Sequence, residues 1–240
     1  MRLRRPSPKI FFLHIPKTAG TSLRETVQRA YPGKRCVMVY SQEPAYLRSI
    51  QKDVQRAEAV YGHFSFGFNE VFGVEARYVT VLRDPIARVV SFFRHEAQHD
   101  DNEFYEQIAN GMTLIDLLRS EQCFQVNNHM VRIISGHDDI ATTHDVRLLR
   151  QAEANLEAHF DVVGITEDMN RSVELMAERL DWARRRSALQ RLNVTPEDKP
   201  VVLDDATRAE IARYNTLDIE LYRGVAQRFA GAVSAGERPA

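Results

Sequence analysis

The chain has few cysteines and almost no net charge, and each shortage argues against a class of protein. Only two cysteines occur among 240 residues, Cys36 and Cys123, and their wide separation forms no metal-binding spacing. They are compatible with a reducing compartment. The net charge of −1 gives no support for a basic surface that binds nucleic acid.

The sequence also lacks a long apolar run. The basic residues 1–6 are followed only by Ile10–Ile15, which is too short for a signal segment or a membrane span. We therefore expect a soluble cytoplasmic protein without stable membrane insertion. With 44% hydrophobic residues, residues 1–240 can form a single domain with an ample core. Residues 231–240, rich in Gly, Ala and Ser, are expected to be a flexible tail.

Strand and helix patterns alternate along the chain. Short apolar or β-branched runs predict strands at Ile10–Ile15, Arg35–Tyr40, Arg77–Leu82 and Asp161–Ile165. Amphipathic patterns predict helices at Ser22–Tyr31, Pro44–Ala57, Asp145–Ala158 and Met169–Trp182, and one bent helix or two helices within Asp204–Phe229. This alternation favours an α/β fold with a central parallel sheet flanked by helices.

The most informative segment is the turn Pro16–Ser22, which lies between the first strand and the first helix. It holds one Lys, two Thr, one Ser and one Gly. A turn of this kind directs backbone N–H groups and a helix N-terminus at one point, which suits an anionic group. Lys17 adds a positive charge, so the segment predicts a phosphate site. It is not a Walker A loop, because the Lys precedes the Gly.

A simpler interpretation of the same turn is helix capping. Thr21 or Ser22 could cap the helix, and Ser22 with Glu25 fits a capping box. Capping alone does not require Lys17 and Gly20 to stand together after a hydrophobic strand.

A second strand–turn–helix element follows at residues 77–94. Asp84 is placed as an N-cap, with Pro85 at the first helical position. Arg83 stands at the end of the strand and Ser91 about two turns into the helix, roughly 10 Å away. An extended Arg can narrow that gap, so both could hold a further phosphate. The alternative is that Arg83 pairs with a carboxylate and Ser91 only packs.

Together the two elements resemble the sulfotransferases that use 3′-phosphoadenosine 5′-phosphosulfate (PAPS), most closely the heparan and uronyl 2-O-sulfotransferase branch and its bacterial relatives. The resemblance continues through Gly62–Phe64, Asn128–Gly136, Val162–Glu167 and Asn215–Tyr222. It implies a P-loop-like nucleotide-binding fold in which Ile15–Ser22 grips the 5′-phosphosulfate. Arg83 and Ser91 would grip the 3′-phosphate.

The resemblance further implies transfer of a sulfuryl group from PAPS to an acceptor hydroxyl, on a saccharide or another small molecule, with 3′-phosphoadenosine 5′-phosphate (PAP) as product. Lys17 would stabilise charge on the phosphate as the bond breaks. Further backbone and hydroxyl donors would come from Thr18, Ala19, Gly20, Thr21 and Ser22. We expect no metal. Animal members are anchored in the Golgi membrane, so the missing anchor indicates a bacterial enzyme.

His63 is the candidate general base. It follows the apolar stretch Ala57–Gly62, which places it at the carboxyl end of a strand, where ligands bind in open α/β sheets. A His with an ordinary pKa near 6.5 suits acceptance of a hydroxyl proton. In the resembled 2-O-sulfotransferases a His in such a Gly-His motif acts as base. Those enzymes often carry another His two residues earlier, where this chain has Tyr61.

Other polar residues permit two interpretations each. His14, inside the first strand, is expected to be buried and hydrogen-bonded. Asn193 either closes a loop over the nucleotide or stabilises a turn before Pro196. Arg132 and His129, on a predicted helix, either face the acceptor or pair across the surface.

Three rival functions have a sequence basis. His95-Glu96-Ala97-Gln98-His99 fits the zinc-protease motif H-E-x-x-H, but Asp100 and Asp101 follow at once and no extended motif exists. A small-molecule kinase using ATP would keep the fold but lacks the Walker A pattern. The third rival function is a nucleotide-binding module that has lost catalysis. The presence of Lys17 and His63 argues against it.

Overall fold

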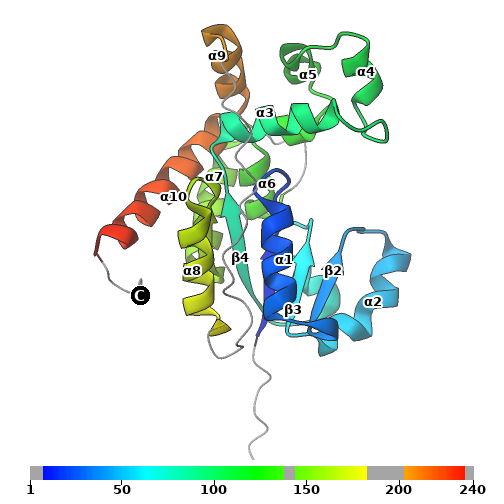
Figure 1. The fold of residues 1–240 in the computed structure, drawn as a ribbon, viewed down its shortest axis with the longest axis vertical. Coiled ribbons are helices and arrows are strands. Elements are labelled where there is room, and N and C mark those ends of the chain that lie inside the picture. The colour runs from blue at the N-terminus through cyan, green and yellow to red at the C-terminus, as the bar shows by residue number, and fades with distance from the viewer. Residues whose placement is uncertain (1–7, 138–143, 183–202, 236–240) are drawn as a thin grey trace, which may run out of the picture.

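The computed structural model describes residues 8–137, 144–182 and 203–235, and these form a five-stranded parallel sheet with helices on both faces (Figure 1). The strand order is β2-β3-β1-β4-β5, and every neighbouring pair is parallel. The strands are β1 Lys9–Leu13, β2 Cys36–Val39, β3 Ala59–Gly62, β4 Ala76–Leu82 and β5 Phe160–Ile165. This confirms the α/β fold with a central parallel sheet.

The described helices connect these strands and extend the fold beyond one edge of the sheet. The α-helices are α1 Gly20–Ala30, α2 Pro44–Arg56, α3 Pro85–Glu96, α4 Tyr105–Ala109, α5 Leu114–Ser120, α6 His129–Ser135, α7 Val146–His159, α8 Met169–Arg179, α9 Asp205–Tyr214 and α10 Thr216–Ala235. Short 3₁₀ helices are η1 Gly33–Arg35, η2 Phe68–Phe72, η3 Phe124–Val126 and η5 Thr166–Asp168. None of the described helices is long and apolar enough to cross a membrane.

The C-terminal helical segment, predicted as one bent helix or two helices, consists of the two helices α9 and α10. The predicted tail is partly wrong, because α10 continues through the Gly-Ala-rich residues to Ala235. Residues 236–240 lie outside the described ranges.

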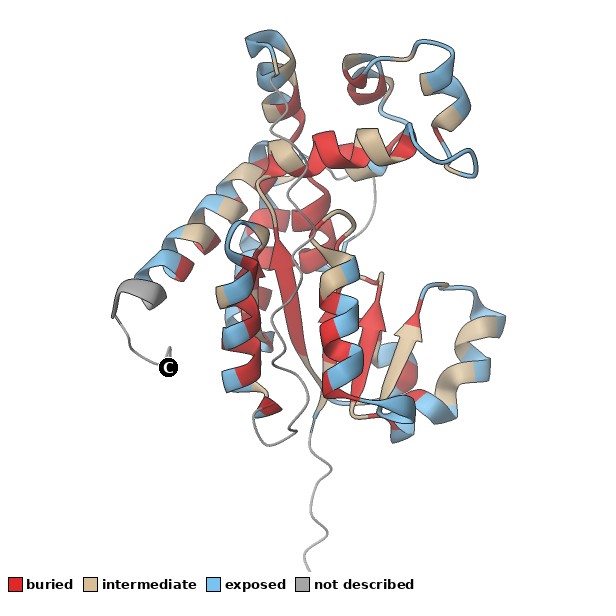
Figure 2. Cartoon of the chain, in the orientation of Figure 1, coloured by how far each residue is buried: buried red, intermediate tan, exposed pale blue. Residues whose placement is uncertain are grey.

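Side chains alternate across the sheet, and neighbouring residues of β1 pack against different groups on the two faces. Phe12 packs against Tyr31 and Trp182, at the ends of α1 and α8, with ring centroids 6.0 and 6.2 Å away. Phe11 points to the opposite face, where it packs against Phe64 and Tyr78 at 5.7 and 5.6 Å. The central strands β3 and β4 are largely buried, whereas the edge strand β2 is mostly half-buried (Figure 2).

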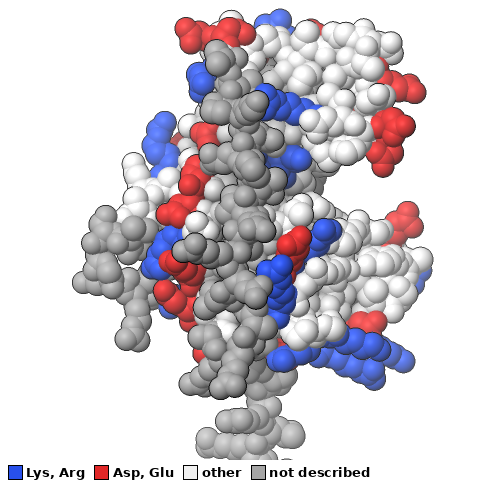
Figure 3. All heavy atoms as spheres, in the orientation of Figure 1, with Lys and Arg blue, Asp and Glu red and all other residues white. Residues whose placement is uncertain are grey.

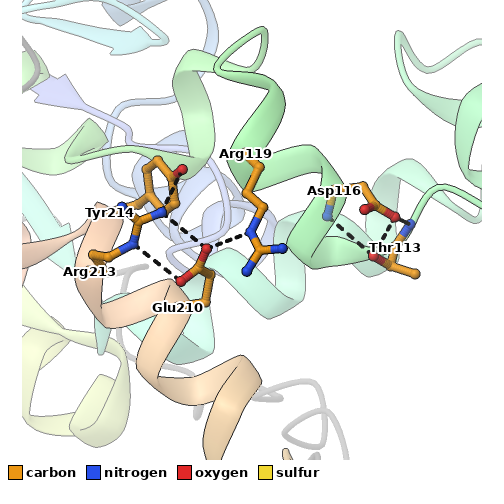
Figure 4. Close-up of polar contacts among 6 residues, drawn as sticks. All are labelled: Thr113, Asp116, Arg119, Glu210, Arg213 and Tyr214. Carbon is orange, nitrogen blue, oxygen red and sulfur yellow. Dashed lines mark hydrogen bonds and ion pairs between the residues drawn. The ribbon is translucent and has the colours of Figure 1, made fainter.

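A second, smaller core joins α3, α5 and α9 at the end of the molecule beyond the sheet. Its outer surface carries polar contacts (Figure 4): Thr113 and Asp116 form a capping box at the start of α5, and Glu210 on α9 accepts hydrogen bonds from Arg119 and Arg213. Exposed ion pairs of this kind contribute less than about 1 kcal/mol each, so burial of apolar side chains is the main stabilising contribution in this layer.

The starts of α6 and α10 are held together by a buried reciprocal cap. The side-chain oxygen of Asn128 accepts N–H groups at the start of α10 at 2.9 and 3.2 Å, while Asn215 accepts the N–H of Asn128 at 3.1 Å. Asp218 accepts two N–H groups from the first turn of α6 at 3.0 and 2.8 Å. Because these groups are fully buried, they fix the position of His129, the first residue of α6.

Candidate active site

A cavity of about 1020 Å³ lies at the carboxyl edge of the sheet. The residue directly after each of the five strands contributes to its wall: His14, Tyr40, His63, Arg83 and Thr166. The helices α1, α3 and α6 supply further side chains. This is the edge at which open parallel sheets bind ligands.

The turn between β1 and α1 has an unusual backbone conformation. Lys17 and Ala19 both adopt left-handed backbone conformations, with φ of 70° and 59°. For residues other than Gly, such conformations cost about 1–3 kcal/mol and cluster at functional sites. The Thr18 hydroxyl stabilises the turn by donating to the carbonyl of Ile15 at 2.8 Å. The turn therefore delivers the N-terminus of α1, and Lys17, to the cavity.

Two expectations for this turn need correction. The Thr18 side chain is fully buried and its hydroxyl is used within the turn, so only its main-chain N–H is left to serve a ligand. The Ser22 capping box is wrong, because α1 begins at Gly20 with Ala19 as an N-cap that has no side-chain hydrogen bond. Thr21 and Ser22 instead stand in the first turn of α1 and line the cavity.

Gly20 is required by the packing of the site. A Cβ atom at this position would lie 2.0 Å from Nε2 of His14, which no real contact tolerates. The His14 ring also stacks on Tyr61, with centroids 5.6 Å apart at 20°, and the Tyr61 hydroxyl donates to the Gly20 carbonyl at 2.9 Å. Tyr61 thus braces the turn from β3.

The second predicted element meets the first. Asp84 is the N-cap of α3 and accepts the N–H of Ala87 at 2.9 Å, as expected, with Pro85 following. The Arg83 guanidinium donates to the carbonyl of Lys17 at 3.3 Å. Arg83, Ser91 and Lys17 all line the same cavity. The structure therefore brings together the two segments that the sequence assigned to phosphate groups.

The charges around the cavity suit an anionic ligand. Among the described residues, the Lys and Arg side chains that line it are Lys17, Arg24 and Arg83. The acidic groups there accept main-chain N–H groups: Glu167 accepts from Asp84 at 2.9 Å, and Glu96 from Phe104 at 3.2 Å. On the face seen in Figure 3, acidic and basic side chains are interspersed.

Histidines form the wall near β1 and β3. The rings of His14 and His63 are 4.8 Å apart. Burial, together with the positive charges of His63, Lys17 and Arg24, lowers the pKa of His14 to about 3. Burial also lowers the pKa of His63, although a hydrogen bond with the main chain of His14 opposes this. Both rings are therefore neutral near neutral pH. His14 is buried as expected, but its Nδ1 has no hydrogen-bond partner among the described residues.

Arg132 is fully buried, so the expectation of surface pairing is wrong. Its guanidinium donates to the carbonyls of Phe124 and Asn127, the latter at 3.2 Å, and lies 3.3 Å from Nδ1 of His129. Arg132 is not among the residues that line the cavity, whereas His129 is. The weak assignment of Arg132 to substrate is corrected to a supporting position behind His129.

The H-E-x-x-H motif does not form a zincin helix. α3 ends at Glu96, so His99 lies beyond the helix, and the Glu96 carboxylate binds the N–H of Phe104. Within the described ranges no third His, Cys, Asp or Glu joins them in a metal-binding group. Asn193 lies outside the described residues.

Comparison with known proteins decides the family. A profile of the sulfotransferase family matches residues 3–223. The chain belongs to this family. This match favours sulfuryl transfer over the kinase and zinc-protease alternatives. No curated protein sequence matches the chain.

Two solved sulfotransferase structures are similar to this chain. One, from Alicyclobacillus acidocaldarius, is 12% identical with a TM-score of 0.50, and the match covers 92% of this chain and 96% of that one. The other, mouse sulfotransferase SULT7A1 complexed with PAP, is 14% identical with a TM-score of 0.46 over 90% of this chain. The chain spans 66% of the length of the mouse protein. At 12% identity, the likeness to the Alicyclobacillus acidocaldarius structure is one of fold.

Proposed function

We propose that this sulfotransferase moves a sulfuryl group from PAPS to a hydroxyl of a carbohydrate acceptor and releases PAP. The observation that supports this most is the meeting of two anion-binding elements in one cavity, joined by the hydrogen bond from Arg83 to the Lys17 carbonyl. PAPS carries anionic groups at two separate positions of its ribose. ATP carries all of its phosphates at one.

The donor would lie between the two elements. The turn Ile15–Ser22 and the N-terminus of α1 would hold the 5′-phosphosulfate through main-chain N–H groups and the hydroxyls of Thr21 and Ser22. Arg83 and Ser91 would hold the 3′-phosphate. Each charge-assisted hydrogen bond of this type contributes about 1.5–3 kcal/mol.

The transfer would proceed as an in-line displacement at sulfur. The acceptor oxygen forms a bond to sulfur while the bond from sulfur to the bridging phosphate oxygen breaks, and that oxygen keeps the electron pair. The acceptor proton passes to a neutral nitrogen of His63. The Lys17 ammonium stabilises the negative charge that develops on the departing phosphate. The products are a sulfate ester and PAP.

His63 suits the role of base for two structural reasons. It stands directly after β3, at the edge of the sheet where the donor turn also ends, and it lines the cavity. Because burial lowers its pKa, the ring is unprotonated and able to accept a proton near neutral pH.

The acceptor would enter beside β2 and η3. Tyr40, which is 52% exposed, and Gln42 line this part of the cavity with Phe124. Aromatic side chains together with an amide suit a ring that is apolar on its face and bears hydroxyls at its rim. We therefore assign a saccharide as the acceptor class.

Calorimetric titration of the purified protein with PAP and with ATP tests the donor assignment. We expect PAP to bind with 1:1 stoichiometry and ATP to bind at least tenfold more weakly, since ATP has no 3′-phosphate for Arg83. Arg83→Gln should weaken PAP but not adenosine 5′-phosphosulfate, which lacks the 3′-phosphate. Equal affinity for PAP and ATP would refute the proposal.

A further inference from the structure

His129 is a cavity residue that the transfer described above does not use. It is 2% exposed, it is the first residue of α6, and it lines the cavity. Its Nε2 is buried and has no hydrogen-bond partner in the part of the chain that the structure describes. Buried polar groups nearly always have a partner, so an orphan on the wall of a binding cavity indicates a contact that a ligand supplies.

The neighbour on the other side of the ring sets its tautomer. An Nη2 atom of Arg132 lies 3.3 Å from Nδ1 of His129. A guanidinium group only donates hydrogen bonds, so Nδ1 must accept, and the hydrogen of the neutral ring is then on Nε2. Burial and the charges of Arg88 and Arg132 hold the pKa of His129 well below its ordinary value. Nε2 is therefore a fixed donor, with no lone pair to accept a proton.

Arg132 itself is held rigidly. Its guanidinium also donates to the carbonyls of Phe124 and Asn127. The reciprocal cap between α6 and α10 fixes the backbone of His129. The direction of the Nε2–H bond is therefore set by the fold rather than by the ligand, which lowers the entropic cost of binding to it.

The position of α6 assigns His129 to the acceptor side of the cavity. The loop after His63 is tied to α6 by a 2.9 Å hydrogen bond from the N–H of Phe66 to the carbonyl of Ile133. Ile133, one turn further along α6, lines the cavity as well. The donor elements come from α1 and α3 instead. His129 therefore shares its wall with the proposed base.

We propose that His129 is an acceptor-binding residue, whose Nε2–H donates a hydrogen bond to an oxygen of the acceptor, and that Arg132 is the positioning residue that fixes this tautomer. The inference rests on the proposed sulfuryl transfer and adds to it a specificity element. It favours acceptors with an oxygen lone pair close to the reacting hydroxyl, such as a vicinal hydroxyl or a ring oxygen. His129 moves no proton in the reaction.

Two matched variants separate the two nitrogens of the ring. In His129→Asn the amide oxygen can replace Nδ1 as the acceptor for Arg132, but no donor remains at the Nε2 position. In His129→Gln the amide nitrogen reaches about as far as Nε2 and keeps the donor. Acceptors are 4-nitrophenyl glucoside, galactoside and glucuronide, with radiolabelled PAPS as donor. We expect His129→Asn to raise the acceptor KM about tenfold or more. In His129→Gln we expect the acceptor KM to stay close to the wild-type value.

The readouts distinguish this inference from the proposed function. PAP affinity, measured by calorimetry, should change less than about twofold in both variants. Unchanged acceptor KM in His129→Asn, or a loss confined to PAP affinity, overturns the role of His129 while sulfuryl transfer stands. Absence of transfer to every glycoside in the wild-type protein overturns the saccharide class, and absence of PAP binding overturns the donor.

A spectroscopic measurement tests the tautomer without any acceptor and without a variant at His129. Nitrogen-15 NMR of the histidine-labelled protein distinguishes a ring protonated on Nε2 from one protonated on Nδ1 or on both. We expect His129 to show the Nε2–H form throughout the pH range in which the protein is folded. An Nδ1–H form, or a charged ring near neutral pH, contradicts the inference even if both variants fail to fold.

Discussion

The two sides of the cavity are built in different ways. The proposed donor side consists of short turns stabilised by contacts close in sequence, such as Thr18 with Ile15 and Asp84 with Ala87. The proposed acceptor side depends on α6, whose start is held by contacts with Asn215 and Asp218, 87 or more residues away in sequence. A local pattern can therefore reveal a phosphate site, whereas only the complete fold reveals the orientation of His129.

The two sides also differ in charge. Permanent cations, Lys17 and Arg83, line the cavity on the proposed donor side. The histidines on the other wall are kept neutral by burial. Acid should therefore impair the histidine wall long before it affects the donor side, and substitutions on the two sides should give different kinetic signatures.

Replacement of His63 should have the largest effect. Loss of a general base typically costs about 10²–10⁴ in rate, so we expect kcat of His63→Ala to fall by that amount. PAP affinity should remain within about twofold, because the ring belongs to the acceptor side. His159→Ala, at an exposed histidine that ends α7 and does not line the cavity, serves as the control. Full activity of His63→Ala would remove the proposed base.

Lys17→Ala should lower both kcat and donor affinity. Removal of one group that stabilises developing charge costs about 10²–10³ in kcat. In contrast to His63→Ala, PAP binding should weaken as well, which calorimetry measures directly. Lys34→Ala, an exposed cation in η1, is the matched control. If Lys17→Ala keeps wild-type PAP affinity, the turn does not hold the donor.

Low pH should reduce activity and stability through protonation of histidines of the cavity wall, namely His63 and His129. Because the pKa of His63 is lowered, the acid limb of kcat/KM should have its midpoint below the ordinary value of about 6.5. The same reasoning applies to stability. Unfolded His129 takes up a proton near pH 6.5 and the folded ring does not, so the free energy of unfolding decreases as pH falls below that value.

Each such proton contributes about 1.4 kcal/mol per pH unit below the pKa of the unfolded residue. His129→Gln should therefore show a shallower loss of stability with acid than the wild-type protein, by up to about that slope. Denaturant unfolding at a series of pH values gives the comparison. Identical slopes would mean that His129 is charged in the folded state.

The smallest effect is expected far from either wall. Glu210 links Arg119 of α5 to Arg213 of α9 on the surface of the second core. Glu210→Gln should change the free energy of unfolding by less than about 1 kcal/mol and leave kcat/KM unchanged. A large change in kcat/KM would show that the α5–α9 layer is coupled to the cavity. The catalytic function would then depend on more than the two sides of the cavity.

Sequence reasoning found the sheet, the Lys17 turn and the Asp84 cap because each is encoded within a few residues. It misassigned the Thr18 hydroxyl, since nothing local shows that Ile15 offers its carbonyl. It also left Arg132 either facing the acceptor or on the surface, although three polar residues, Asn127 to His129, interrupt an apolar stretch there. Polar residues at the start of an apolar helix are the signal of a buried network, and some of its partners come from the start of α10.

The crystal structure of the protein with PAP tests the central claim most directly. We predict the 5′-phosphate at the first turn of α1 within hydrogen-bond distance of Lys17, and the 3′-phosphate against Arg83 and Ser91. A nucleotide bound with its 3′-phosphate away from Arg83, or bound outside the cavity at the carboxyl edge of the sheet, would contradict the account.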